Sequence, residues 1–255
     1  MKMKHTLAAL SVAALTMAGT GLAADGQEDK WQFGATIPLW APQVNGNVTV
    51  RGHQQNVDVS FNQLKDHLDA SFALGLQART EKFGFFADVG YMKFSGGNGG
   101  LSDDLKFLVA DGGVLYRLLK TGEERPFILE ATAGLRFWGT KNEITLRDSG
   151  GSILFSGSKN RDLEDPIIGL RATKYLTQKL HLDFAGDVGG FGISDNQAEL
   201  DWSATGLVTY DFAKWFSLSA GYKALALNAS DGSGRRENGV DLIFNGALLT
   251  AKFKF

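Results

Sequence analysis

Apolar side chains alternate with polar or small ones along most of the chain. Between residues 243 and 255 the odd positions are apolar except for Asn245, whereas the even positions include Lys252 and Lys254. Successive side chains of a β-strand point to opposite faces, so this stretch predicts a strand with one apolar and one polar face. The same alternation predicts nine further strands, over residues 31–40, 69–80, 83–94, 105–118, 126–138, 165–175, 179–189, 199–212 and 215–227.

Short turns and long loops alternate between these predicted strands. Only Glu81 and Lys82 separate two of them, whereas the polar stretch from Asn142 to Asn160 separates another pair. Short connections on one side and long ones on the other are typical of bacterial outer-membrane barrels, which carry an even number of strands. We therefore predict an all-β fold, a transmembrane up-and-down antiparallel β-barrel of about ten strands. Eight strands follow if one weak pair is misread, and twelve if a short hairpin over residues 48–59 joins the wall.

Three features place the apolar faces against lipid. Charge is almost absent from the middle of those faces, as a lipid-facing band requires. Aromatic residues on them gather near the strand ends, as in interfacial girdles. The opposite faces carry Asp, Glu and Arg in mid-strand, which the packed interior of a soluble barrel would not tolerate. The alternative is a soluble periplasmic barrel or sandwich with its apolar face inward.

The polar faces are then predicted to line a lumen. Mixed signs at similar depth favour ion pairs that fill a narrow interior over a ring of one charge. About ten strands enclose a lumen only slightly wider than that of eight-stranded barrels, so a wide diffusion pore is not expected. The charged residues predicted to line the lumen are Arg79, Asp88, Asp111, Arg117, Glu130, Arg136, Arg171, Asp183, Asp187, Asp201 and Lys223.

A long first connection, residues 41–68, precedes the second predicted membrane strand. Two valine-rich runs in its first half predict the short hairpin. Phe61, Leu64 and Leu68 then follow at helical spacing, which predicts one or two turns of amphipathic helix. This piece is a candidate plug of the lumen or cap of its mouth, and the alternative is an ordinary ordered loop.

The first residues have the pattern of an export signal. A basic start precedes an uncharged core rich in Ala, Leu and Val, and a small-x-small motif ends at Ala23. We expect a Sec-type signal peptide over residues 1–24, with an uncleaved membrane anchor as the alternative. The remaining residues, 25–255, are then one exported barrel domain located in the outer membrane.

Composition excludes several classes of function. The 255 residues include no Cys and carry a formal net charge of −2. The sequence therefore offers no disulfide and no thiolate metal site, and it lacks the basic stripe of a nucleic-acid binder. We predict no cofactor and no metal. The uncharged stretch after Trp31 contains Pro38 and Pro42, which rule out a bilayer helix there.

Catalytic chemistry has one weak candidate. His181 and Asp183 share a strand face and could act as a base and its orienting carboxylate. His181 begins its predicted strand beside a short turn, at the end opposite the long loops. We therefore predict a lumen ion pair and no enzyme, with a hydrolase acting on lipid A or peptides as the alternative.

Several motifs resemble those of a family of small proteobacterial outer-membrane β-barrels, OmpA- and OmpW-like in general architecture. They are Gly186–Gly192, Asp201-Trp202, Gly221–Lys223 and the segment from Val57 to Asp69. The resemblance implies the barrel fold and no defined activity. The ending on Phe253 and Phe255 is similar to the closing strand of such barrels, whose terminal Phe serves as an insertion signal for the barrel-assembly machinery.

Together these features predict an integral outer-membrane barrel, structural or narrow and porin-like, with a charged and largely filled lumen. Its expected partners are outer-membrane lipid and lipopolysaccharide, the barrel-assembly machinery, and a small solute that the sequence does not identify. Arg235 and Arg236 are a candidate contact for lipopolysaccharide phosphates. A binding or adhesin-like barrel, acting through residues 142–160 and 228–238, is a further alternative.

Overall fold

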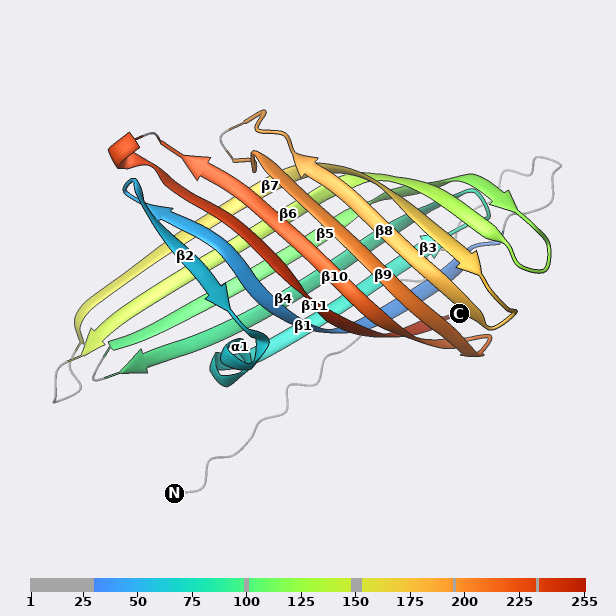
Figure 1. The fold of residues 1–255 in the computed structure, drawn as a ribbon, viewed down its shortest axis with the longest axis horizontal. Helices are drawn as coiled ribbons and strands as arrows, with labels where there is room; N and C mark the ends of the chain where they lie inside the picture. Colours follow the sequence, from blue (N-terminus) through green and yellow to red (C-terminus); the bar gives the residue numbers. More distant parts are fainter. Residues whose placement is uncertain (1–29, 99–100, 148–152, 195, 233) are drawn as a thin grey trace, which may run out of the picture.

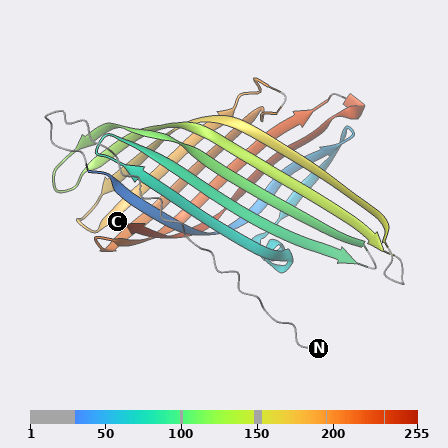
Figure 2. The same cartoon turned by 180° about the vertical axis from the view of Figure 1, so that it is seen from behind.

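The computed structural model describes residues 30–98, 101–147, 153–194, 196–232 and 234–255. The expected signal peptide lies outside these residues. Eleven strands form a single antiparallel sheet, and β11 pairs with β1 to close it (Figures 1 and 2). Ten strands make the closed barrel, and β2 is an additional strand beside β1. The predicted fold class is therefore confirmed.

Strand bounds follow the predicted order along the chain. The strands are β1 (Gln32–Val50), β2 (His53–Val59), β3 (Leu68–Arg79), β4 (Phe83–Asn98), β5 (Leu101–Thr121), β6 (Phe127–Arg147), β7 (Ile153–Tyr175), β8 (Leu180–Gly190), β9 (Leu200–Ala213), β10 (Phe216–Asp231) and β11 (Asn238–Lys254). One helix, α1 (Phe61–His67), lies between β2 and β3, and a 3₁₀ turn, η1 (Gly234–Arg236), precedes β11. Among the described residues, no helix has the length and apolar character to cross a membrane.

Several strands extend well beyond their predicted ends on the long-loop side. The sequence predicts that the first strand ends at Trp40, but β1 continues to Val50, so the first connection is shorter than residues 41–68. The predicted polar loop from Asn142 to Asn160 is also largely strand, because β6 reaches Arg147 and β7 begins at Ile153. A spanning strand needs about 9 to 11 residues, whereas β7 has 23. These strands therefore continue past the thickness of a bilayer.

The apolar faces point outward. On β7 the neighbouring residues Ile167 and Ile168 are 5% and 56% exposed, as expected when successive side chains alternate across the wall. Leu135 on β6 and Phe184 on β8 are also exposed, and charged side chains occupy the inward positions beside them. Aromatic rings gather at the short-turn end, where Phe216 lies 5.4 Å from Phe253 between ring centroids. This arrangement suits a wall surrounded by hydrocarbon.

Towards the long-loop end the strands of the barrel wall separate into two groups. Figure 1 shows β10, β11, β1 and β2 running to one corner and β4 to β7 running to another. One division lies between β7 and β8, whose ladder stops at Ile167 opposite Gly189. Pro166 follows on the edge that faced β8, where it has no N–H to donate. The β8–β9 loop fills this division, because Asn196 accepts a hydrogen bond from the backbone of Glu164 at 2.9 Å.

Candidate functional site

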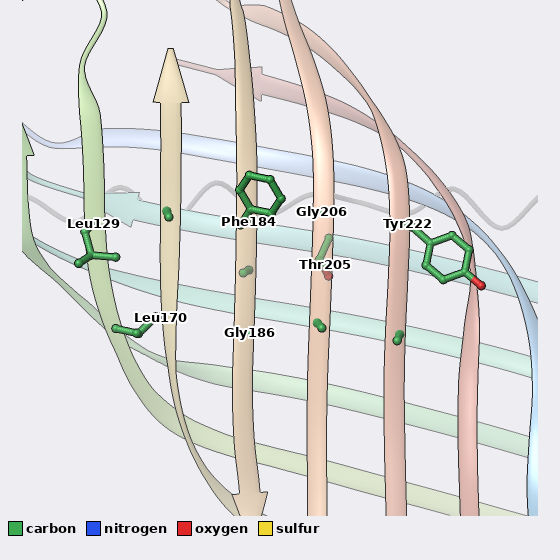
Figure 3. Close-up of a pocket in the computed structure, with 11 residues that line it drawn as sticks. Leu129, Leu170, Phe184, Gly186, Thr205, Gly206 and Tyr222 are labelled. Atoms are coloured by element: carbon green, nitrogen blue, oxygen red, sulfur yellow. The ribbon is translucent and has the colours of Figure 1, made fainter. Parts of the chain in front are cut away.

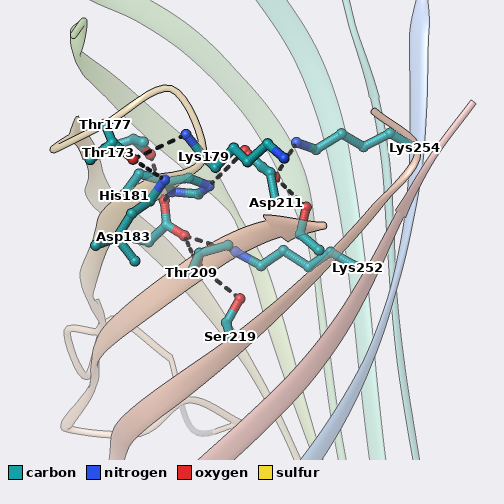
Figure 4. Close-up of polar contacts among 12 residues, drawn as sticks. Thr173, Thr177, Lys179, His181, Asp183, Thr209, Asp211, Ser219, Lys252 and Lys254 are labelled. Atoms are coloured by element: carbon teal, nitrogen blue, oxygen red, sulfur yellow. Dashed lines mark hydrogen bonds and ion pairs between the residues drawn. The ribbon is translucent and has the colours of Figure 1, made fainter. Parts of the chain in front are cut away.

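The barrel interior holds stacked layers of side chains. At the short-turn end, Asp183 of β8 is the acceptor at the centre of a polar network (Figure 4). Thr173 and Thr209 donate their hydroxyls to it at 2.8 and 2.6 Å, and the Lys252 ammonium lies 2.9 Å away. His181 approaches the same carboxylate through Nδ1 at 3.2 Å. The network thereby links β7, β8, β9 and β11, which lie on one side of the barrel.

The other side of His181 meets a second carboxylate. Its Nε2 lies 3.6 Å from Asp211 Oδ2, and Asp211 also accepts from Ser217 and pairs with Lys254 at 3.3 Å. His181 is only 5% exposed. Ser217 donates its hydroxyl to Asp211, and Ser219 is hydrogen-bonded to Thr209 of the same network at 2.8 Å. The pair considered as a base and its orienter is therefore enclosed in a structural network.

A second layer lies on the β3 to β6 side of the interior. Glu130 of β6 accepts a hydrogen bond from Arg79 of β3, and the Arg117 guanidinium lies 3.7 Å from the same carboxylate. Arg171 of β7 stacks over Phe86, with its guanidinium carbon 4.5 Å from the ring centroid. Phe86 is an inward aromatic that is 8% exposed. Apolar and charged side chains thus share this depth of the lumen.

Arg136 is the hub of the middle layer. Its guanidinium makes two hydrogen bonds to Asp111, at 2.8 and 2.9 Å, and lies 3.0 Å from Asp187 and 3.3 Å from Asp201. Trp138 donates its indole N–H to Asp201 at 3.1 Å. Arg136 is 1% exposed and Asp201 is fully buried. A buried charge of this kind is tolerated only when it is paired and hydrogen-bonded.

The remaining predicted lumen residues also point inward. Asp88 of β4 lies against Gly75, where a Cβ would come within 2.4 Å of the carboxylate. Lys223 of β10 lies over the Trp40 ring, 5.5 Å from its centroid. The structure thus places all eleven predicted charges on the inner side of the wall. Eight of them take part in the ion pairs, which centre on Glu130, Arg136 and Asp183, and Arg171 and Lys223 lie over aromatic rings.

Above the charged layers lies a group of apolar side chains, which we call the apolar cluster. Its buried members are Val44, Phe107, Trp138, Leu163, Ala198, Leu225, Leu227, Ala229 and Phe244, and Trp40, Val57, Leu64 and Met92 are among the residues packed against it. Phe107 stacks on Phe244 across the lumen at 5.2 Å. The sequence analysis did not predict this cluster. The sequence does contain a sign of the cluster. Leu225, Leu227 and Phe244 are apolar residues at inward-facing positions near the long-loop end, where they interrupt the polar face of their strands.

The candidate plug lies at the level of the apolar cluster. α1 begins with a capping box. The Gln63 backbone N–H donates to the Ser60 side chain, and the Gln63 side chain accepts a hydrogen bond from the Ser60 backbone N–H. Leu64 packs against the apolar cluster, whereas Phe61 and Leu68 are half-buried and no residue of α1 is fully buried.

At the opposite end, the Phe255 backbone exchanges two hydrogen bonds with Phe33, each 3.0 Å long. Whether Phe253 and Phe255 act as an insertion signal stays a prediction.

A shallow apolar groove of about 570 Å³ crosses the outer face of β6 to β10 (Figure 3). Small residues such as Gly186 and Gly206 form its floor, and Leu129, Phe184 and Tyr222 stand around it. Because it faces away from the lumen, the groove belongs to the surface that contacts hydrocarbon. Within the described residues, no group of three or more His, Cys, Asp or Glu side chains could hold a metal ion.

Exposed ion pairs lie on the strand extensions beyond the bilayer level. Glu143 of β6 lies 2.7 Å from Lys141 and 2.9 Å from Lys106. Hydrogen bonds from these two ammonium groups lower the pKa of Glu143 to about 2.

Comparison with known proteins supports the fold and leaves the activity open. No protein-family model and no curated protein matches the chain. The outer-membrane protease OmpT from Escherichia coli is a structural neighbour, with a TM-score of 0.52 and 9% identity over 89% of this chain and 98% of that one. A major outer-membrane protein from Thermus thermophilus and the attachment invasion locus protein Ail of Yersinia pestis align with TM-scores of 0.39 and 0.36. The Thermus thermophilus protein is 14% identical, and the alignment covers 88% of this chain and 99% of that protein. Ail is 12% identical, and the alignment covers 89% of this chain and 99% of Ail. The chain therefore has the fold of outer-membrane β-barrels.

Proposed function

We propose that the protein is an integral outer-membrane β-barrel whose interior is closed by its own side chains. The observation that carries this proposal is the succession of layers from the Asp183 network through the Arg136 hub to the apolar cluster. The Asp183 network joins β7, β8, β9 and β11, the Arg136 hub joins β5, β6, β8 and β9, and Phe107 of β5 stacks on Phe244 of β11. Water and ions therefore meet packed side chains and desolvated charges in place of a continuous aqueous path.

Support for a membrane location comes from the wall itself. Exposed Leu, Ile and Phe side chains cover the outside, and the charges lie inside. In a soluble barrel such an apolar surface would be a large aggregation hazard. We propose outer-membrane lipid and lipopolysaccharide as the surroundings of this wall, with assembly through the closing strand β11.

The protein is proposed to act without catalysis. His181 and Asp183 are held by Thr, Lys and Asp partners within the wall, and the imidazole has little exposed surface. A substrate would have to displace this network in order to reach it. Lipid A mass spectra and peptide-cleavage assays that stay unchanged on deletion of the protein support this assignment, and a lost modification or cleavage contradicts it.

Planar-bilayer recordings of the refolded protein test the closed interior directly. Folding is first checked by the heat-dependent shift in electrophoretic mobility that a stable barrel shows, so that misfolded protein is not scored. We expect no stable conductance steps. Long-lived uniform steps from folded protein would show a continuous pore and overturn the proposal.

The extended strands favour a second candidate, a binding role outside the membrane. β5 and β6 each have 21 residues and β7 has 23, about twice the number that a bilayer requires. The β6–β7 hairpin is therefore a structured surface beyond the headgroups. Shortening both strands by matched residue pairs above Lys141 and Asn160 should abolish binding to an envelope or host partner while leaving the barrel folded. Unchanged binding would remove this candidate.

A further inference from the structure

The wall has a second division, between β1 and β3, that no other strand fills. Their ladder runs from Gln32 opposite Arg79 to Thr36 opposite Gly75. β1 pairs on this edge again only from Val44, where β2 lies beside it. Residues 37–43 of β1 and 68–74 of β3 thus face one another without a ladder, and we call this opening the wall gap. Figure 1 shows β1 and β3 leaving in different directions, with α1 near the mouth between them.

Two prolines explain why the ladder stops. Phe33 exchanges both backbone hydrogen bonds with Phe255, which follows directly after β11, so the backbone N–H and C=O groups of the odd residues of β1 point to β11 and those of the even residues point to β3. Pro38 and Pro42 are therefore on the gap edge, and neither has an N–H to donate. Continuing the register would set Pro38 against Ala73 and Pro42 against Asp69. Among the three even-numbered residues of β1 in the gap, only Trp40 has a backbone N–H that can donate a hydrogen bond.

The wall gap lies at the depth of the hydrocarbon. A strand rises about 3.3 Å per residue and barrel strands tilt by about 40°, so each residue gains roughly 2.5 Å of height. The gap then spans roughly 12 to 28 Å above Gln32, so most of it falls in the upper half of an apolar band about 25 Å tall. Only lipid chains are present at that depth outside the barrel.

Apolar surfaces line both sides of the gap. On the outside, Leu39 of β1 is 69% exposed and Phe72 of β3 is 54% exposed. On the inside, Trp40, Leu64 and Met92 pack against the apolar cluster. The hydrocarbon outside and the apolar cluster inside are thereby separated only by the gap.

The covering of the wall gap is slight. α1 lies at its upper end and contacts β1 and β4, yet none of its seven residues is buried. The division between β7 and β8 is different, because the β8–β9 loop seals it with a backbone hydrogen bond and the buried Ala198. Among the described residues, no backbone hydrogen bond outside the ladders joins the gap edges of β1 and β3, and Leu68 at the end of the gap donates its N–H to Lys65 of α1.

We propose that the wall gap admits an acyl chain of a bilayer lipid to the apolar cluster, with the Trp40 ring as the contact just inside. Leu64 of α1 moves aside as the chain enters. This inference rests on the proposed membrane location, and it adds a lateral lipid site to a barrel that is closed along its axis.

Photolabelling in vesicles tests the site in the intact protein. The probe is a phosphatidylethanolamine that carries a diazirine in the middle of one acyl chain, and labelled residues are mapped by peptide mass spectrometry. We expect label on the inward residues Trp40 and Met92 in addition to outward residues such as Phe184. Leu115 is 0% exposed and is not a member of the apolar cluster, so it serves as the internal background.

A blocking variant gives the matched comparison. Ala73→Trp fills the gap edge of β3, whereas Ala133→Trp adds the same side chain to the exposed face of β6. We expect Ala73→Trp to lower labelling of Trp40 to the level of Leu115, and Ala133→Trp to leave it unchanged. Label on Phe184 with none on Trp40 in the native chain would overturn the lipid site and leave the membrane proposal intact. Absence of label from Phe184 as well would overturn both.

Discussion

Replacing Arg136 by Met keeps much of the side-chain volume and removes the charge of the hub. Three carboxylates, on Asp111, Asp187 and Asp201, then lose a guanidinium that lies within 3.3 Å of each. Removing one partner of a buried ion pair costs about 3–5 kcal/mol, because the other charge is left buried and unpaired. Arg136 is 1% exposed, so solvent offers little compensation. An energy of that size lowers the folding equilibrium constant roughly 150- to 5000-fold.

The assay is reversible urea unfolding of the refolded protein in lipid vesicles, followed by tryptophan fluorescence. Glu81→Gln is the control, because it removes a charge from an exposed ion pair with Lys120 and should leave the unfolding midpoint unchanged. Adding Asp111→Asn to Arg136→Met removes one of the stranded charges, so the double variant should be more stable than the sum of the two single effects. A loss below about 1 kcal/mol for Arg136→Met would refute the view that the hub is buried and dry.

Three further perturbations follow from single contacts. Asp183→Asn should destabilise the barrel by about 2–3 kcal/mol in the same urea assay, since it weakens several charge-assisted hydrogen bonds at once. Gly46→Ala should lower the unfolding midpoint, because Gly46 has φ +142° and a Cβ there would lie 2.0 Å from a carbonyl oxygen of β11. Gly34→Ala is the control and should be tolerated, since the nearest contact of its Cβ would be at 3.4 Å. The Glu143 pKa is lowered in the folded state, from 4.5 to about 2. The ionised Glu143 carboxylate should therefore stabilise the fold fully above pH 4.5, and this stabilisation should disappear as the pH falls through 2. An NMR titration of Glu143 with a midpoint near 4.5 would contradict that pairing.

The alternation of side chains was enough to predict the wall. A period of two assigns each residue to a face whatever its partners are, so Phe184 and Asp183 could be placed on opposite sides from the sequence. The sequence did not reveal which charges meet, because the partners of Arg136 come from β5, β8 and β9. Their meeting depends on barrel closure and strand register.

Strand ends on the long-loop side differ from the prediction for a physical reason. Beyond the bilayer both faces meet water or other protein, so the apolar signal fades while the ladder continues. Ile144 and Leu146 still alternate with polar neighbours in the stretch that the sequence analysis assigns to a loop. Pro38 and Pro42 are typical interruptions of a strand, yet β1 continues through both because they lie on an edge that has no partner.

The central claim is that the apolar side chains face hydrocarbon and the charged ones face the lumen. Ile167 and Ile168 test it most directly, because they are adjacent, identical and on opposite faces of β7. The chain has no Cys, so Ile167→Cys and Ile168→Cys can each carry one spin label without background. In vesicles the label at 168 should collide with oxygen dissolved in the lipid and the label at 167 should not. The reverse result, or equal contact with a water-soluble paramagnetic reagent at both positions, would contradict the account.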